Sequence, residues 1–257
     1  MSRDIWDPTQ YGRYADERSR PFFDLIARVR AEKPRRVADL GCGSGELTAT
    51  LAERWPDAVV TGLDSSEAMI AKAVAANPGV EFAVADLRDW QPEPDTDVVV
   101  SSAVFQWVPG HRELLVDWAE RLPAGAWLAF QVPGNFAAPS HEAIRRVCAS
   151  PRWTVVADVP RPDPVSSPAE YLDLLTACGL DVEAWETTYL HVLPGDDPVL
   201  EWVKGTALRP ILDRLPDPEE RAAFLADLGA RLREAYPRKP YGTVFPFRRV
   251  FVVARKP

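Results

Sequence analysis

The sequence predicts an α/β protein with a mostly parallel β-sheet and a helical cap inserted near its C-terminal end. Strand-like and helix-like segments alternate regularly between residues 37 and 132, which is typical of βαβ units. A glycine-rich turn follows the first of these strands, where such sheets bind ligands. Roughly fifty residues with helical patterns separate the last two strands, whereas a usual hairpin loop has about 2–5.

The composition is that of a globular protein and favours one domain with an elaboration. The chain has 257 residues, of which 46% are hydrophobic and 26% charged. Its formal net charge of -8 argues against a general nucleic-acid surface, because such surfaces are usually basic. We expect a single domain over residues 1–257, with an N-terminal arm at 1–20 and a cap insertion at 195–243.

Cysteine spacing and hydropathy predict the compartment. The three cysteines (Cys42, Cys148 and Cys178) show neither metal-type spacing nor a disulfide framework, which favours a reduced, intracellular setting. The first residues lack the apolar core of a signal peptide, and no apolar run is long enough to cross a bilayer. We therefore expect a cytoplasmic monomer that binds small molecules and neither nucleic acid nor membrane.

The first half of the chain supplies most of the sheet. Apolar residues at a helical period predict a helix over 22–31, which Pro34 would end. Strands are expected at 37–40, 59–63, 80–85, 97–104 and 125–132, with helices at 47–55, 66–76 and 111–121. The fourth strand is unbroken and carries the β-branched run Val98–Val100, as expected for a strand buried on both faces.

The pattern changes after Pro133. Helices are expected at 140–148 and 168–178, on either side of a proline-rich irregular passage, and Gly179 is placed to end the second helix. Strands follow at 181–193 and 244–254, and helical patterns at 198–215 and 218–236 between them form the cap. The aromatic arm (Trp6, Tyr11 and Tyr14) either anchors the chain to the core or closes over a ligand, and both interpretations stay open.

The glycine turn and the acid before it point to a cationic ligand. Gly41, Gly43 and Gly45 follow the first strand in the order G-x-G-x-G, which lets the backbone approach a ligand closely. This spacing departs from the G-x-G-x-x-G of dinucleotide enzymes. Asp39 would repel a pyrophosphate and attract an ammonium group. The turn therefore favours a ligand with a cationic amino-acid portion, such as S-adenosylmethionine.

Two further acids end the next two strands. Asp64 can accept hydrogen bonds from both hydroxyls of a ribose, and Asp86, with the Leu87 backbone, from an adenine amino group. Met69 could pack on the adenine ring. Each acid alone could instead cap a turn. Three acids at the ends of three successive strands predict a nucleoside-binding site.

Three motifs resemble the class I S-adenosylmethionine-dependent methyltransferases: VADLGCGSG at 37–45, TGLDSS at 61–66 and ADLRDW at 85–90. The resemblance implies a Rossmann-like, mostly parallel seven-stranded sheet with an antiparallel last strand, and S-adenosyl-L-methionine as the cofactor. It also adds Cys42, Ser65 and Ala103 to the cofactor site. In the arm, Tyr11 and Arg20 resemble the lead-in of the family, where Arg20 could hold the methionine carboxylate.

Longer motifs, FQWVPGH at 105–111 and WVKGTALRP at 202–210, resemble the subfamily that methylates trans-aconitate, and this likeness covers nearly the whole chain. It implies methyl transfer to one carboxylate, giving a monomethyl ester. A carboxylate has a pKa near 4 and is already ionised at pH 7, so we expect in-line attack without a general base. We nominate neither a catalytic residue nor a metal ligand.

A trianionic acceptor needs positive charge and hydrogen bonds. Arg209 in the cap is the first candidate, because arginine can grip a carboxylate with two bonds. The others are His141 and Arg145 on one helix face, Tyr189 on the strand before the cap, and Arg249 on the last strand. Each could instead be a solvated or packed residue. Trp107 either lines the pocket or belongs to the core.

Three alternatives remain open. The same cofactor could serve another small-molecule acceptor, such as a natural product or a quinone precursor. A dinucleotide oxidoreductase is opposed by the glycine spacing and by Asp39. A non-catalytic protein that only senses the cofactor is opposed by the large cap, because lids commonly exclude water around a reaction.

Overall fold

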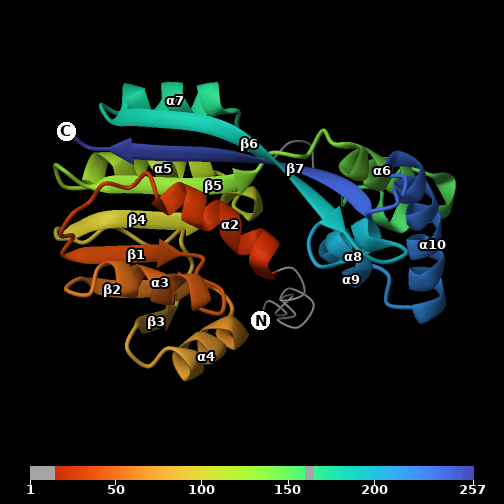
Figure 1. Ribbon diagram of the computed structural model, residues 1–257, viewed down its shortest axis with the longest axis horizontal. Coiled ribbons are helices and arrows are strands. Elements are labelled where there is room, and N and C mark those ends of the chain that lie inside the picture. Colours follow the sequence, from red (N-terminus) through yellow and green to blue (C-terminus); the bar gives the residue numbers. More distant parts are fainter. Residues whose placement is uncertain (1–14, 160–164) are drawn as a thin grey trace.

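The computed structural model describes residues 15–159 and 165–257, which contain a seven-stranded sheet of order β3-β2-β1-β4-β5-β7-β6 (Figure 1). Neighbouring strands from β3 to β5 pair in parallel, and β7 is antiparallel to both β5 and β6. The predicted class and the antiparallel last strand are confirmed. The strands are β1 (Arg36–Leu40), β2 (Val59–Asp64), β3 (Glu81–Val84), β4 (Thr96–Ser102), β5 (Trp127–Pro133), β6 (Asp181–Leu193) and β7 (Thr243–Arg255).

Helices cover both faces of this sheet. On one face, Phe22 of α2 and Leu51 of α3 share a buried core with Phe251 of β7. On the other, Trp118 of α5 and Tyr171 of α7 pack against the opposite side of the same strands. Burial on both faces explains the uninterrupted β-branched run of β4. The helices around the sheet are α2 (Ala15–Ile26), α3 (Glu46–Arg54), α4 (Glu67–Ala76), α5 (His111–Arg121) and α7 (Pro168–Ala177).

The two longest strands carry the cap. Pairing of β7 with β5 ends at Pro133 and Arg249, but its pairing with β6 continues to Leu193 and Thr243. The resulting two-stranded ribbon runs out of the sheet into a group of helices (Figure 1). These are α6 (Pro139–Cys148), α8 (Pro198–Lys204), α9 (Arg209–Asp213) and α10 (Pro218–Ala235), with the 3₁₀ helix η2 (Pro151–Val156).

The cap is larger than the predicted insertion at 195–243. The apolar face of α6, with Ile144 and Val147, lies in the same buried core as Phe224 and Leu228 of α10. The backbone N–H of Ser140 also donates to the Tyr236 hydroxyl at 3.0 Å. The amphipathic α6 buries its apolar face against α10, so the segment that follows β5 belongs to the cap as well.

The predicted helix over 198–215 is in fact two helices, α8 and α9. The backbone N–H of Leu208 bonds to the Val203 carbonyl at 3.0 Å, across a turn that contains Gly205. Glycine is a poor helix former, and Pro210 is tolerated in the first turn of the helix that restarts. The ribbon and the split helices place Arg209 at the start of α9.

The first helix is also displaced from its prediction. Residues 15–20, expected in the arm, belong to α2, which ends at Ile26 rather than Ala31. The Arg54 guanidinium accounts for the early end, because it donates to the carbonyls of Ile26 and Val29 at 2.8 and 2.7 Å. The rest of the arm, with Trp6, Tyr11 and Tyr14, lies outside the described residues, so its role stays a prediction.

Candidate active site

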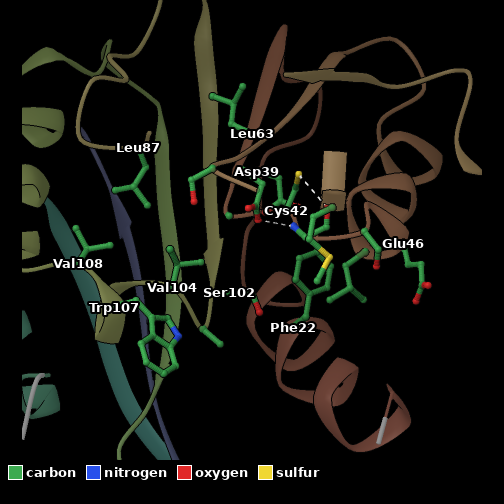
Figure 2. A pocket seen from close by; sticks show the side chains of 18 of the residues that line it. Phe22, Asp39, Cys42, Glu46, Leu63, Leu87, Ser102, Val104, Trp107 and Val108 are labelled. Atoms are coloured by element: carbon green, nitrogen blue, oxygen red, sulfur yellow. Dashed lines mark hydrogen bonds between the residues drawn. The ribbon is translucent and has the colours of Figure 1, made fainter. Parts of the chain in front are cut away.

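A cavity of about 660 Å³ lies over the carboxyl ends of β1, β2 and β4 and against α2 (Figure 2). Parallel sheets bind their ligands at this edge. The cavity brings together eleven of the predicted site residues, in addition to Trp107, Phe22 and Phe23. These eleven are Asp39, Gly41, Cys42, Gly43, Asp64, Ser65, Met69, Asp86, Leu87, Ala103 and Arg249.

The glycines of the turn have different roles. A Cβ atom on Gly41 would lie 2.2 Å from a Val104 methyl carbon, and one on Gly45 would lie 2.7 Å from the Phe82 ring. A Cβ atom on Gly43 would meet no atom within 4 Å, although its φ of 55° is left-handed like the others. Packing therefore requires Gly41 and Gly45, whereas Gly43 leaves space beside the cavity for a ligand.

Asp39 is a buried acid at the end of β1. Its side chain is only 3% exposed, and the Thr48 hydroxyl donates to its Oδ2 at 2.7 Å. Burial raises the pKa of Asp39 from 3.8 to about 6, and the negative charge of Asp64 adds to the rise. A cation placed against this carboxylate would offset the desolvation cost of its negative charge.

Asp64 holds the glycine turn to the end of β2. Its Oδ2 accepts the backbone N–H of Gly43 at 2.9 Å, and its Oδ1 accepts that of Ser66, also at 2.9 Å. Ser66 is the N-cap of α4, because its hydroxyl accepts the Met69 N–H at 3.2 Å. Ser65 is thereby left on the cavity wall, beside the buried Met69.

Asp86 differs from the expected open acceptor. Both of its oxygens accept the Arg88 guanidinium, and Oδ1 also accepts the Arg88 backbone N–H at 2.9 Å. This ion pair lowers the pKa of Asp86. A carboxylate oxygen can still accept a further bond, so its contact with an adenine stays a prediction.

The loop after β4 forms another part of the cavity wall. Among the residues that the structure describes, Ala103 is the one non-glycine residue with a positive φ, 60°. Its backbone N–H donates to the Gln131 carbonyl at 2.9 Å. This left-handed residue ends β4 before the predicted boundary at 104. Trp107 lines the cavity, and Figure 2 shows its ring near Val104 and Val108. Its pocket-lining interpretation is confirmed.

Arg249 lines the cavity from β7 and is 6% exposed. Its Nη1 donates to the Gln131 Oε1 at 2.9 Å, and the Gln131 Nε2 donates to the Ser102 Oγ at 2.7 Å. Sequence reasoning missed Gln131 and Ser102. A single polar residue inside the apolar strand WLAFQVP was the available signal for Gln131.

The predicted acceptor residues of the cap lie elsewhere. His141, Arg145 and Arg209 are absent from the described cavity wall. The His141 ring packs edge-on against Phe136 at 5.0 Å, and burial with the Arg145 charge lowers its pKa to about 4, so it is neutral at pH 7. Arg145 donates to the Phe136 carbonyl at 2.8 Å, and Arg209 is buried in the cap.

Tyr189 and Arg20 join α2 to β6. The Tyr189 hydroxyl donates to Asp24 Oδ2 at 2.5 Å, and burial together with this carboxylate raises the pKa of Tyr189. The Arg20 guanidinium lies over the Tyr189 ring, 5.2 Å from its centroid. Neither Tyr189 nor Arg20 lines the described cavity, although Ser19, the residue before Arg20 in α2, does. Their roles in ligand binding stay predictions, as does that of Tyr11.

Residues 15–159 and 165–257 contain neither a metal-binding cluster nor a membrane-spanning helix. They hold no group of three or more side chains suited to a metal ion. They also form no helix with the length and hydropathy needed to span a membrane.

The fold and the acid-lined glycine turn are those of the Rossmann-like methyltransferases. A family model described as a methyltransferase domain matches residues 37–125. The solved phosphoethanolamine N-methyltransferase 2 of Haemonchus contortus, in complex with phosphomonomethylethanolamine and S-adenosylhomocysteine, superposes with a TM-score of 0.57 at 16% identity. That match covers 93% of this chain and 52% of the other, and it shows the fold.

Curated relatives define the family more narrowly. Proteins named trans-aconitate 2-methyltransferase from Rhodococcus jostii and Mycolicibacterium gilvum are each 54% identical to this chain. Each match covers 98% of this chain and 99% of the relative. The chain belongs to the family of these methyltransferases.

Proposed function

We propose that this protein transfers the methyl group of S-adenosyl-L-methionine to a carboxylate of trans-aconitate or a close tricarboxylate. The products are the monomethyl ester and S-adenosylhomocysteine. The observation that carries the proposal is the separation of charge along the cavity. Asp64 and Asp39 end β2 and β1, whereas Arg249 lies on β7, three strands beyond β1. Three strand spacings are about 14 Å, enough to separate a cationic ligand from an anionic one.

The acidic side fits the cofactor. The buried Asp39 carboxylate suits the ammonium group, and Asp64 suits the ribose hydroxyls. The open space at Gly43 lets the ligand approach the turn, while Met69 and Leu87 offer apolar contact to the adenine ring. These assignments rest on residues that line one cavity.

The chain's part in the reaction is orientation and exclusion of water. When bound, S-adenosylmethionine supplies an electrophilic methyl group, whose bond to sulfur breaks with the electron pair left on sulfur as a carboxylate oxygen bonds the carbon. The acceptor is already ionised at pH 7, so no side chain has to remove a proton. Arg249 holds the anion, and Phe22, Val104 and Trp107 give the cavity apolar walls.

Arg209, Arg145, His141 and Tyr189 remain proposed acceptor ligands, Arg209 because it lies in the family motif at 202–210 and the other three because of their places on the helix and strand. We place the protein in the cytoplasm, because Cys42, Cys148 and Cys178 are all free thiols, which suits a reduced compartment. A monomeric state is part of the same proposal, and the molar mass in solution tests it.

Product analysis tests the function. The protein is incubated with S-adenosylmethionine and trans-aconitate, and mass spectrometry is used to detect the monomethyl ester. Other tricarboxylates, phenols and amines are tested under the same conditions. We expect the ester as the main product. Preferential methylation of a phenol or an amine would select the alternative acceptor class, and calorimetry without S-adenosylhomocysteine binding would refute a methyltransferase altogether.

The glycine turn supports a prediction on cofactor binding. Gly43→Ala is expected to cost about 1–2 kcal/mol of stability, because alanine must adopt a left-handed conformation. Its methyl group would also crowd the ligand and weaken S-adenosylhomocysteine binding by about tenfold.

Gly41→Ala serves as the matched variant for Gly43→Ala. Its added methyl group meets Val104 rather than the ligand, so we expect a larger loss of thermal stability than for Gly43→Ala. Thermal unfolding and calorimetry measure the two effects. Equal stability of both variants, with equal cofactor affinity, would contradict the division of roles within the turn.

A further inference from the structure

Three polar side chains lie on neighbouring strands at the edge of the sheet that faces the cavity. Ser102 of β4 pairs in register with Gln131 of β5, and Gln131 lies opposite Phe251 of β7. Arg249 is two residues from Phe251, so its side chain points to the same face as Gln131. Gln131 is 1% exposed, and its neighbours on both sides line the cavity.

The direction of the hydrogen bonds in this group follows from chemistry. A guanidinium only donates, so the Gln131 oxygen must face Arg249 and its NH₂ group must donate to Ser102. The Ser102 oxygen accepts this bond, which leaves its hydroxyl hydrogen to donate to another acceptor. Both ends of the group are therefore donors, an arginine N–H at one end and a serine O–H at the other.

A single amide sets the spacing of these donors. The Arg249 Nη1 lies 2.9 Å from the Gln131 oxygen, and the Ser102 Oγ lies 2.7 Å from its nitrogen. A carboxylate has nearly the same width as an amide and forms hydrogen bonds of similar length. One acceptor carboxylate can therefore span the same two donors, and a guanidinium with five N–H groups can hold Gln131 and an anion together.

The absence of a charge on Gln131 matters for acceptor binding as much as its position does. A glutamine fixes the arginine side chain without adding a negative charge beside it. A carboxylate in its place would form an ion pair with Arg249 and compete with the acceptor.

We infer that Gln131 is a positioning residue for methyl transfer, which holds Arg249 and Ser102 as paired donors for one carboxylate of the acceptor. This inference rests on the proposed function and deepens it, because it assigns the acceptor carboxylate to the Ser102–Gln131–Arg249 group. A purely structural role predicts a different outcome, since a buried amide that only satisfies its neighbours affects folding and not acceptor affinity.

Steady-state kinetics on Gln131→Glu and Gln131→Met test the inference. For Gln131→Glu we expect the KM for trans-aconitate to rise at least about thirtyfold, because the new carboxylate neutralises Arg249. For Gln131→Met, which carries no charge, we expect a rise of about tenfold, and a similar rise for Ser102→Ala. The kcat at saturating acceptor and the Kd for S-adenosylhomocysteine should stay within about twofold.

Thr96→Val is the matched control. Thr96 is a fully buried polar residue at the other end of β4, outside the described cavity wall. Its variant should change neither KM nor kcat, and thermal unfolding reports whether each protein is folded. Gln131→Met keeps the test decisive if Gln131→Glu does not fold.

The outcomes separate the two proposals. A wild-type protein that methylates trans-aconitate, with an unchanged KM in Gln131→Met and Ser102→Ala, overturns the inference alone. Parallel losses of cofactor affinity and acceptor affinity would also overturn it, because they indicate that the substitution disturbs the whole cavity rather than the two donors. A wild-type protein that methylates only neutral acceptors, or none, overturns the proposed function and the carboxylate group with it.

Discussion

Asp39→Asn is expected to stabilise the ligand-free protein at pH 7 and to weaken cofactor binding by about a hundredfold or more. The substitution removes a buried charge but keeps an oxygen that can accept the Thr48 hydroxyl. It also removes the carboxylate that we propose for the cofactor ammonium. Stability and binding should therefore change in opposite directions, as is common where a site carries a destabilising charge.

The pH dependence gives the size and sign of the stability change. The pKa of Asp39 rises from 3.8 to about 6 on folding, so between these values the folded state holds the proton more tightly than the unfolded state. The free energy of unfolding therefore falls as the pH rises through this range. Above pH 6 the ionised acid costs about 3 kcal/mol, and Asp39→Asn should recover most of it.

Cofactor binding should depend on the same proton. A bound ammonium group favours the ionised acid, so binding near pH 6 is expected to release a proton, and the affinity should decrease below about pH 6. Calorimetry in two buffers with different ionisation enthalpies measures the release. In Asp39→Asn this release should be lost.

The exposed Asp57, in the loop before β2, provides the control for Asp39. Asp57→Asn removes one negative charge without touching the cavity wall, so it should leave both stability and affinity nearly unchanged. If Asp39→Asn bound S-adenosylhomocysteine as tightly as the wild type, the ammonium assignment would be wrong. A less stable Asp39→Asn at pH 7 would contradict the origin of the pKa shift.

Arg249→Met is expected to lower kcat/KM for trans-aconitate by about thirtyfold or more, with little change in cofactor affinity. Arg249 is a buried cation on the wall of the cavity, and methionine preserves the apolar part of its side chain. Because burying a guanidinium is costly, the free energy of unfolding should change little or rise. Initial rates at varied acceptor concentration and calorimetry with S-adenosylhomocysteine give the two constants.

Arg209→Met tests the sequence-based first candidate against Arg249. Arg209 begins α9 inside the cap and lies outside the described cavity wall, so we expect a smaller effect on the acceptor KM than for Arg249→Met. The free energy of unfolding should change little or rise for this variant as well, because Arg209 is also a buried guanidinium, 9% exposed among packed cap residues. A larger KM effect for Arg209→Met would assign the main acceptor contact to the cap.

Local patterns predicted most of the elements and the acidic wall of the cavity. The β-branched run of β4 and the glycine turn after β1 are each readable within ten residues, because strand burial and left-handed glycines depend on short-range chemistry. Asp39 lies at the end of β1, just before the glycine turn, and Asp64 is the last residue of β2. Their convergence was predictable because parallel strands end at one edge of the sheet.

Long-range packing was beyond these patterns. The apolar face of α6 indicated a helix, but not that α10 would cover it. The pairing of Asp86 with Arg88 also escaped prediction, because either side chain could have turned toward solvent or ligand. Such choices depend on the surfaces available after the chain has folded.

The sequence by itself determined the α/β class, the glycine turn and the acids at or just after the ends of β1, β2 and β3. Only the tertiary structure decided which cation lines the same cavity as these acids. Arg249 and Gln131 are 118 residues apart and become hydrogen-bonded because β7 inserts between β5 and β6. Arg209, His141 and Arg145 lie on helices of the cap instead, outside the described cavity wall. The physical reason is that local sequence sets conformation, whereas the register between distant strands sets which charged side chains share a cavity.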